Sequence, residues 1–210
     1  MTEILRAYSH PLISRHAFLA ELQWHQDHDR IVAGAYGTGT DDTFRGCAVG
    51  CSLHSIKKIA QIKGPFGYSD HTQYPVYLGI PEVLARLQDQ IFENLPADLR
   101  GTFPIRFSAA IQQDADLSGV WPKFAARILR EIVIPTIRPE FDYVRVVVAR
   151  VAAGWETNWA DDTPSAAWNA AESAATSAAR SAARSAAYQK MADILCEELA
   201  LAPVKEICGK

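Results

Sequence analysis

Six consecutive four-residue units near the C-terminus constrain the fold more than any other feature of this sequence. Residues 165–188 read SAAW, NAAE, SAAT, SAAR, SAAR and SAAY. Because alanine has the highest helix propensity, this run predicts a helix about 36 Å long at about 1.5 Å per residue. Four residues turn about 400°, so the large side chains drift about 40° per unit around a rod of alanine and serine. We expect this helix to continue to about Leu199.

The small side chains of this run allow two roles. The helix could be the central packing helix of the domain, or it could receive a host protein or a second copy of the chain. Helices with small side chains at the contact can pack at short interaxial distances in either case. The sequence therefore leaves open a host-protein partner or a homo-oligomer formed through the alanine-rich helix.

The rest of the chain predicts further helices, separated by segments rich in glycine, proline and short polar residues. The expected helices cover residues 14–33, 47–62, 104–112 and 122–134, and one more begins at Pro81. Residues 141–153 are the main ambiguity, because Y-V-R-V-V-V-A-R-V is β-branched enough for a strand. Its valines also follow the helical period, and no partner strand is apparent elsewhere, so we favour a helix.

These elements predict an all-α protein. The chain has 210 residues, of which 49% are hydrophobic, so it can bury the core of one medium domain. We expect a single helical domain of about seven or eight helices, including the long Ala/Ser-rich helix. Residues 1–164 would hold the helical domain, residues 165–200 the long helix packed on or in it, and residues 201–210 a tail.

Composition excludes several functional classes. The net charge of -3 and the lack of a strong basic patch argue against a nucleic-acid-binding protein. No run of about 18 apolar residues predicts a transmembrane helix, and the N-terminus does not have the pattern of a signal peptide. We therefore expect a cytoplasmic protein without membrane contact, in which the four cysteines are free or metal-bound.

A box of small residues, G-C-A-V-G-C at residues 46–51, is the first candidate for chemistry. On a helical wheel of about 100° per residue, Cys47, Cys51 and His54 fall within about 60° of one another. Apolar anchors of the same helix, such as Val49 and Leu53, fall on the opposite side. If the two cysteines only filled the core, they would lie on the same side of the helix as Leu53. The side that holds Cys47, Cys51 and His54 is therefore a candidate site.

The preceding helix adds a histidine and an aspartate on its apolar stripe. With Phe18 at 0°, Leu22 falls at about 40°, His25 at about 340° and Asp29 at about 20°. A buried carboxylate is costly unless it is paired or bound to a metal. His25 and Asp29 could therefore be a hydrogen-bonded pair that satisfies itself, or an oriented imidazole in an active or metal site.

Three interpretations of these residues stay open. Thiolates and imidazoles suit zinc or iron, and the ligands would come from Cys47, Cys51, His54, His71, His25 and Asp29. Alternatively, a helix N-terminus lowers the pKa of a cysteine nucleophile, Cys47 or Cys51. The base would then be His25, His54 or His71, oriented by Asp29 or Asp70. In the third interpretation the box is only a contact patch of small residues.

The chain resembles a family of uncharacterised phage and bacterial proteins, which often carry alanine-tetrad runs. The resemblance rests on G-C-A-V-G-C-S-L-H, D-H-T-Q-Y, L-G-I-P-E-V-L-A-R-L-Q-D-Q-I-F-E-N-L-P and A-D-L-S-G-V-W-P-K-F, and it covers roughly residues 10–190. It implies a mobile-element context without an established activity.

The leading hypothesis for function is a small metal-binding accessory protein of phage type, with zinc or iron as the ion. A cysteine-nucleophile hydrolase or transferase is the second hypothesis. The third is a phage-type protein-binding inhibitor or structural protein without a catalytic site, in which the alanine-rich helix is the working surface.

Overall fold

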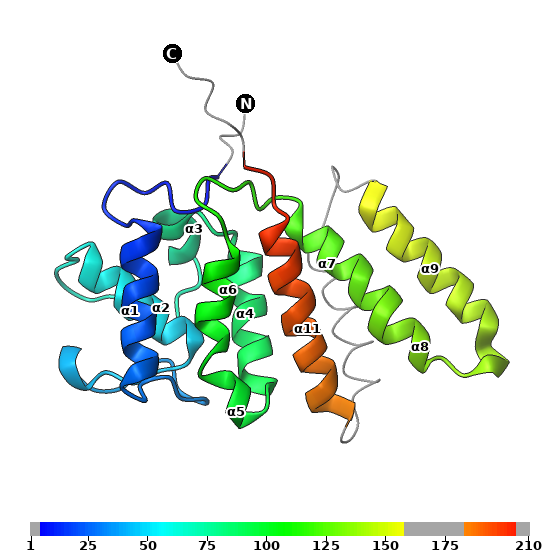
Figure 1. Ribbon diagram of the computed structural model, residues 1–210, viewed down its shortest axis with the longest axis horizontal. Coiled ribbons are helices and arrows are strands. Elements are labelled where there is room, and N and C mark those ends of the chain that lie inside the picture. Colours follow the sequence, from blue (N-terminus) through cyan, green and yellow to red (C-terminus); the bar gives the residue numbers. More distant parts are fainter. Residues whose placement is uncertain (1–4, 158–182, 205–210) are drawn as a thin grey trace, which may run out of the picture.

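Helices dominate the computed structural model, which describes residues 5–157 and 183–204 (Figure 1). Within these residues no strand or sheet forms, and the β-type pairing is confined to isolated bridges such as Ile31 with Gly46. The prediction of an all-α protein is confirmed. No helix in this part of the chain is long and apolar enough to cross a membrane.

The described helices differ widely in length, from three residues to 18. In chain order they are α1 (Arg15–Asp27), α2 (Ala48–Ile59), α3 (Gln73–Leu78), α4 (Glu82–Asn94), α5 (Ala97–Arg100), α6 (Phe103–Ala110), α7 (Val120–Ile128), α8 (Ile134–Thr136), α9 (Asp142–Thr157) and α11 (Ala183–Ala200). Short 3₁₀ turns lie at Asp41–Thr43 and Pro139–Phe141, and the π-helical turn Leu129–Val133 joins α7 to α8.

Helix α1 begins where the sequence predicts and ends earlier. The hydroxyl of Ser14 caps its first turn, but the helix ends at Asp27 rather than near residue 33. Asp29 has a left-handed backbone with φ 52°. Val32 then donates its backbone N–H to Gly46 O at 2.8 Å. The segment after α1 is held in an extended form by the residues just before α2, so the helical wheel does not apply to it.

The valine-rich segment after Pro139 is a helix, α9, as we favoured, and the strand alternative is wrong. Ala152 is fully buried, and Val148 is partly buried against the core, while Val147 and Val151 are exposed. The helix packs against α7 and the π-helical turn, so only one side of its apolar surface joins the core.

Helix α11 belongs to the core of the domain. It lies between α6 and α7 and also contacts α4 (Figure 1). Ala192, Leu195 and Leu199 on its inner face are fully buried. The helix ends at Ala200, close to the predicted end, and its first residues are the last of the alanine tetrads. The tetrads at residues 165–182 lie outside the described residues.

Replacing Leu195 with alanine tests whether α11 is an integral part of the fold. We expect Leu195→Ala to lower the free energy of unfolding by about 3 kcal/mol, because the deletion removes buried methyl groups and leaves a cavity. Urea unfolding followed by circular dichroism measures the change. The control, Leu201→Ala, removes a side chain that is 69% exposed and should have little effect. Equal effects of the two substitutions would contradict the placement of α11 in the core.

Candidate functional site

Helix α2 is buried on every side from Ala48 to Ile56, and it carries the box predicted from the sequence. Cys47 is its N-cap, and both Cys47 and Cys51 are buried. The predicted ligands do not converge on one point. His54 meets His25 from α1, whereas the thiol of Cys47 meets Asp89 from α4. The box therefore contributes to two separate polar contacts.

Gly46 and Gly50 of the box leave space for the backbone of the loop that precedes the box. A Cβ atom at Gly50 would lie 1.5 Å from the carbonyl oxygen of Tyr36, and one at Gly46 would lie 2.5 Å from the same atom. Cys47 donates its backbone N–H to the carbonyl of Ala35 at 2.7 Å. The small-residue contact predicted for the box is therefore present, and its partner is the backbone of the loop that contains Tyr36. This contact fixes the position of Tyr36 beside the N-terminus of α2.

Cys47 lies in a cluster that also contains Tyr36, His71, Asp89 and Glu93, here called the Cys47 cluster. The thiol of Cys47 donates to Asp89 Oδ1 at 3.5 Å. Asp89 Oδ2 accepts from the hydroxyl of Tyr36 at 2.9 Å and lies 3.3 Å from His71 Nε2. Glu93 is one turn further along α4, and one ligand atom each from Cys47, Asp89 and Glu93 lie within 4.8 Å of one another.

Burial and hydrogen bonds set the charges of this cluster. Burial acts to raise the pKa of Asp89, but hydrogen bonds from His71, Tyr36 and Cys47 outweigh it and hold that pKa below its usual value. Burial, the hydrogen bond to Asp89 and the charge of Asp89 raise the pKa of Tyr36 to about 12. Without a metal ion, the cluster therefore has an ionised Asp89 carboxylate that accepts from the neutral Tyr36 hydroxyl and the neutral Cys47 thiol.

The thiols have raised pKa values, which corrects the expectation that a helix N-terminus activates them. Burial is the main cause for both residues, and the pKa is about 12 for Cys47 and about 12 for Cys51. The backbone N–H of Gly50 does donate to Cys47 Sγ at 3.4 Å, but the loss of water and the nearby Asp89 outweigh this contact.

His25 and His54 form a buried pair that joins α1 to α2. Their rings approach through His25 Nε2 and His54 Nδ1, which lie 3.2 Å apart, and the rings are 0% and 3% exposed. The ring of His54 stacks on Phe44 with the centroids 4.2 Å apart. Burial and the positive charges nearby lower the pKa of His25 to about 3, so its imidazole is neutral at pH 7.

The hydrogen-bond partners of the two rings indicate which ring nitrogen of each histidine carries the proton. His25 Nδ1 is buried and has no hydrogen-bond partner in the structure. A buried N–H without a partner is rarer in proteins than an incompletely satisfied acceptor. We therefore place the single proton of His25 on Nε2, from which it donates to His54 Nδ1. His54 then carries its own proton on Nε2.

Three residues that the sequence predicted for the site lie outside both contacts. Asp29 is exposed and lies beyond the end of α1, so it does not orient His25, and the expectation of an inward-facing carboxylate is wrong. Cys51 donates its thiol proton to the carbonyl of Gly46 at 3.3 Å. Asp70 lies in a loop, where its carboxylate accepts from Thr72.

Sequence reasoning missed Tyr36, Asp89 and Glu93. The signal that could have found the acidic pair is the spacing of Asp89 and Glu93, four residues apart on the helix predicted after Pro81. Tyr36 had no comparable signal, because its position depends on how the loop packs against α2. Comparisons with protein-family models, with curated proteins and with solved structures found no match to this chain.

Replacing Gly50 with alanine tests the contact between the loop and α2. We expect Gly50→Ala to lower the free energy of unfolding by at least about 2 kcal/mol, because the new methyl group requires the Tyr36 backbone to move. Gly101 is the control, since it has a helical backbone with φ -59° and no atom within 4 Å of an added Cβ. Gly101→Ala should be neutral or slightly stabilising. Similar melting temperatures for the two variants would contradict the close approach.

The lowered pKa of His25 predicts a loss of stability in acid. Between its ordinary value of 6.5 and its folded value of about 3, the unfolded chain binds a proton that the folded chain does not. The free energy of unfolding should therefore fall as the pH drops below about 6.5, by about 2 kcal/mol from this residue between pH 7 and pH 4.5.

Urea unfolding of His25→Gln at several pH values measures this contribution, because glutamine keeps a polar group in this position but does not titrate. The decline between pH 7 and pH 4.5 should be shallower in His25→Gln than in the wild type. His16→Gln changes an exposed histidine on the same helix and should keep the wild-type decline. Parallel curves for wild type and His25→Gln would show that His25 does not titrate in this way.

Proposed function

We propose that this chain binds one transition-metal ion, zinc or ferrous iron, through Cys47, Asp89 and Glu93. The observation that carries the proposal is the convergence of one sulfur and two carboxylate oxygens within 4.8 Å of one another. Sulfur and carboxylate ligands are a combination that both ions accept. The sequence-based metal hypothesis is kept, but its ligand set changes from six residues to three.

The surroundings of the three ligands suit a metal site. Cys47 is 1% exposed, whereas Asp89 and Glu93 are partly exposed, so an ion can enter from the side of α4. A metal ion would stabilise the Cys47 thiolate, which burial alone disfavours. His71 and Tyr36 contact Asp89 and would orient its carboxylate, as outer-shell partners of metal ligands commonly do. Three protein ligands leave room for a water molecule or a further group at the ion.

Within this proposal the protein is an accessory protein of phage or mobile-element type. This context rests on the resemblance of the GCAVGC box, the LGIP segment and the alanine tetrads, and it remains an expectation. The alternative of a partner-binding inhibitor or structural protein depends on residues 165–182, which lie outside the described part of the chain.

A cysteine nucleophile is supported less well than a metal site. Cys47 does cap a helix N-terminus, and His71 is near, but its thiol contacts the carboxylate of Asp89. A carboxylate beside a thiol raises the pKa of the thiol, whereas a nucleophile needs that pKa lowered. Slow alkylation of every cysteine of the metal-free protein below pH 7 would agree with this ranking, and fast alkylation of Cys47 would reverse it.

Metal analysis of protein purified without added metal tests the proposal. We expect near one equivalent of zinc or iron, and removal by a chelator should lower the melting temperature, because an ion bound only by the folded state stabilises it. Cobalt added to the metal-free protein should give a thiolate-to-cobalt charge-transfer band. The band should disappear in Cys47→Ser and weaken strongly in Asp89→Asn.

Cys51→Ser is the matched control, because it changes a buried cysteine of the same helix whose thiol donates to a backbone carbonyl. This variant should retain both the metal and the cobalt band. Metal-free protein whose melting temperature is unchanged by a chelator would overturn the proposal. Loss of metal in Cys51→Ser but not in Cys47→Ser would move the site to the other cysteine.

A further inference from the structure

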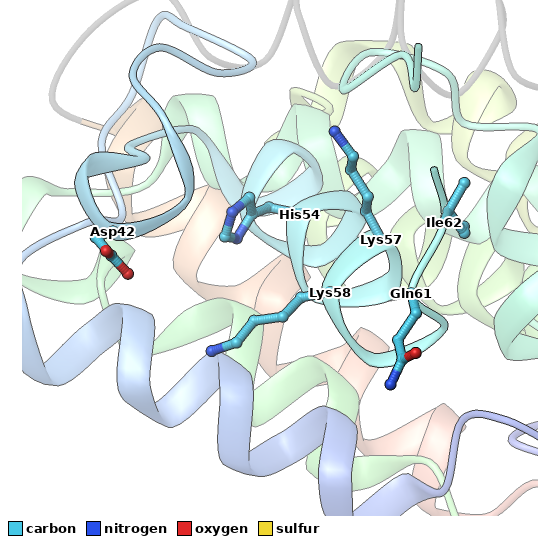
Figure 2. A pocket seen from close by; sticks show the side chains of 6 residues that line it. All are labelled: Asp42, His54, Lys57, Lys58, Gln61 and Ile62. Atoms are coloured by element: carbon cyan, nitrogen blue, oxygen red, sulfur yellow. The ribbon is translucent and has the colours of Figure 1, made fainter. Parts of the chain in front are cut away.

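An open pocket of about 460 Å³ lies beside the C-terminal half of α2, but its charged groups do not converge on one point. It is lined by Asp42, His54, Lys57, Lys58, Gln61 and Ile62. Figure 2 shows the amino groups of Lys57 and Lys58 on opposite sides of the pocket. Lys57 contacts the hydroxyl of Tyr68, and Lys58 binds the carboxylate of Glu21. The surface best suited to a partner lies elsewhere, on the outer side of α9.

The outer side of α9, here called the α9 face, exposes a row of large apolar side chains. Tyr143 is 69% exposed, Val146 48%, Val147 55% and Val151 46%. On a wheel of about 100° per residue these four fall within about 140° of one another, and the fully buried Ala152 falls on the opposite side. A contiguous exposed apolar patch commonly marks an interaction site. The α9 face is therefore a candidate surface for a partner.

The position of α9 leaves room for a second helix along this face. Its inner side packs on α7, on the π-helical turn and on α8. Figure 1 shows α9 at the opposite end of the molecule from α1 and α2, with no other described helix beyond it. The helix has 16 residues and is about 24 Å long at about 1.5 Å per residue. A helix of the same length could therefore lie along the whole face.

Two charged side chains give the α9 face opposite charges in its two halves. Asp142 lies in the first turn of α9, and its side chain is 79% exposed although it lies 3.9 Å from Arg145. Arg150 is also exposed, and it lies about two turns further along, in the middle of the apolar row. The face is therefore negative near its N-terminal end and positive in its second half.

An antiparallel pair of α9 helices would match these charges twice. When two copies meet about a twofold axis between Val146 and Val147, Arg150 of each copy lies opposite Tyr143 of the other copy and beside its Asp142. The pair then gains two ion pairs and two contacts between a guanidinium group and an aromatic ring. The helix dipoles also run in opposite directions, which is the favourable arrangement. A parallel pair would instead place like charges of the two copies side by side.

We infer that the α9 face binds α9 of a second copy of this chain in an antiparallel arrangement and forms a symmetric dimer. A twofold dimer needs only one patch that complements itself, and the α9 face has this property in both its apolar row and its charges. A single pair of helices buries less than the standard interface of about 1,600 Å², so the dissociation constant should be in the micromolar range. This surface is separate from the alanine-rich helix and from the proposed metal site.

Sedimentation equilibrium of the full chain over a range of concentrations tests this dimer. We expect a reversible equilibrium between monomer and dimer. Val147→Asp should raise the dissociation constant at least about tenfold, because it places a carboxylate from each copy at the centre of an apolar contact. Val76→Asp is the matched control, since it changes a valine of α3 that is 60% exposed, and it should leave the dissociation constant unchanged.

Exchange of the two charges tests the antiparallel arrangement. Arg150→Glu places a carboxylate beside Asp142 of the other copy and should weaken the dimer at least about threefold. Adding Asp142→Lys to Arg150→Glu restores two pairs of opposite charge and should recover most of the lost affinity. In a parallel pair the double substitution would still bring like charges together and would recover nothing.

Four results would overturn the inference. A monomer at every concentration up to the millimolar range would assign the α9 face to a different partner. A dimer that Val147→Asp leaves intact would place the interface elsewhere. A dimer that Arg150→Glu weakens and that Asp142→Lys does not restore would exclude the antiparallel arrangement. Loss of the helical circular dichroism signal in Val147→Asp would show that this exposed side chain is needed for the fold itself.

Discussion

The burial of α2 on every side is the constraint on which the rest of this structure depends. A helix without a solvent-facing stripe must find a partner for each polar side chain it carries. Ser52 and Ser55 donate to backbone carbonyls one turn earlier, at 2.8 Å in each case. His54 pairs with His25 of α1. The packing of α1 on α2 therefore includes a polar contact as well as apolar ones.

Side chains of opposite charge lie near the two ends of α2. Their arrangement is the one that the helix dipole favours. The carboxylates of Asp89 and Glu93 lie near the N-terminus, and Lys57 and Lys58 occupy the last turn. Backbone N–H groups at the N-terminus stabilise negative charge, and carbonyl groups at the C-terminus stabilise positive charge. One buried helix thus separates an acidic, thiol-containing cluster from a basic pocket.

Much of the helical organisation could be predicted from local sequence. Ser14 as an N-cap, the helix after Pro81 and the helical period of the valines before Ala152 all reflect interactions within one or two turns. The site was less predictable. The wheel placed Asp29 on the stripe of His25, but the chain leaves the helix before Asp29 to pair with the residues around Gly46. A wheel assumes continued helix and cannot anticipate a competing long-range hydrogen bond.

The sequence by itself determined that this chain is helical and that Cys47 stands at the start of the helix that carries Cys51 and His54, because propensity and period are local properties. Only the tertiary structure decided which of them act together. Cys47 is joined to Asp89, 42 residues away, and His54 to His25, 29 residues away in the other direction. The glycines of the box make this possible, because the missing side chain at Gly50 lets the Tyr36 backbone lie against α2. Such close approaches depend on atoms from distant segments, and so they become visible only when the chain is folded.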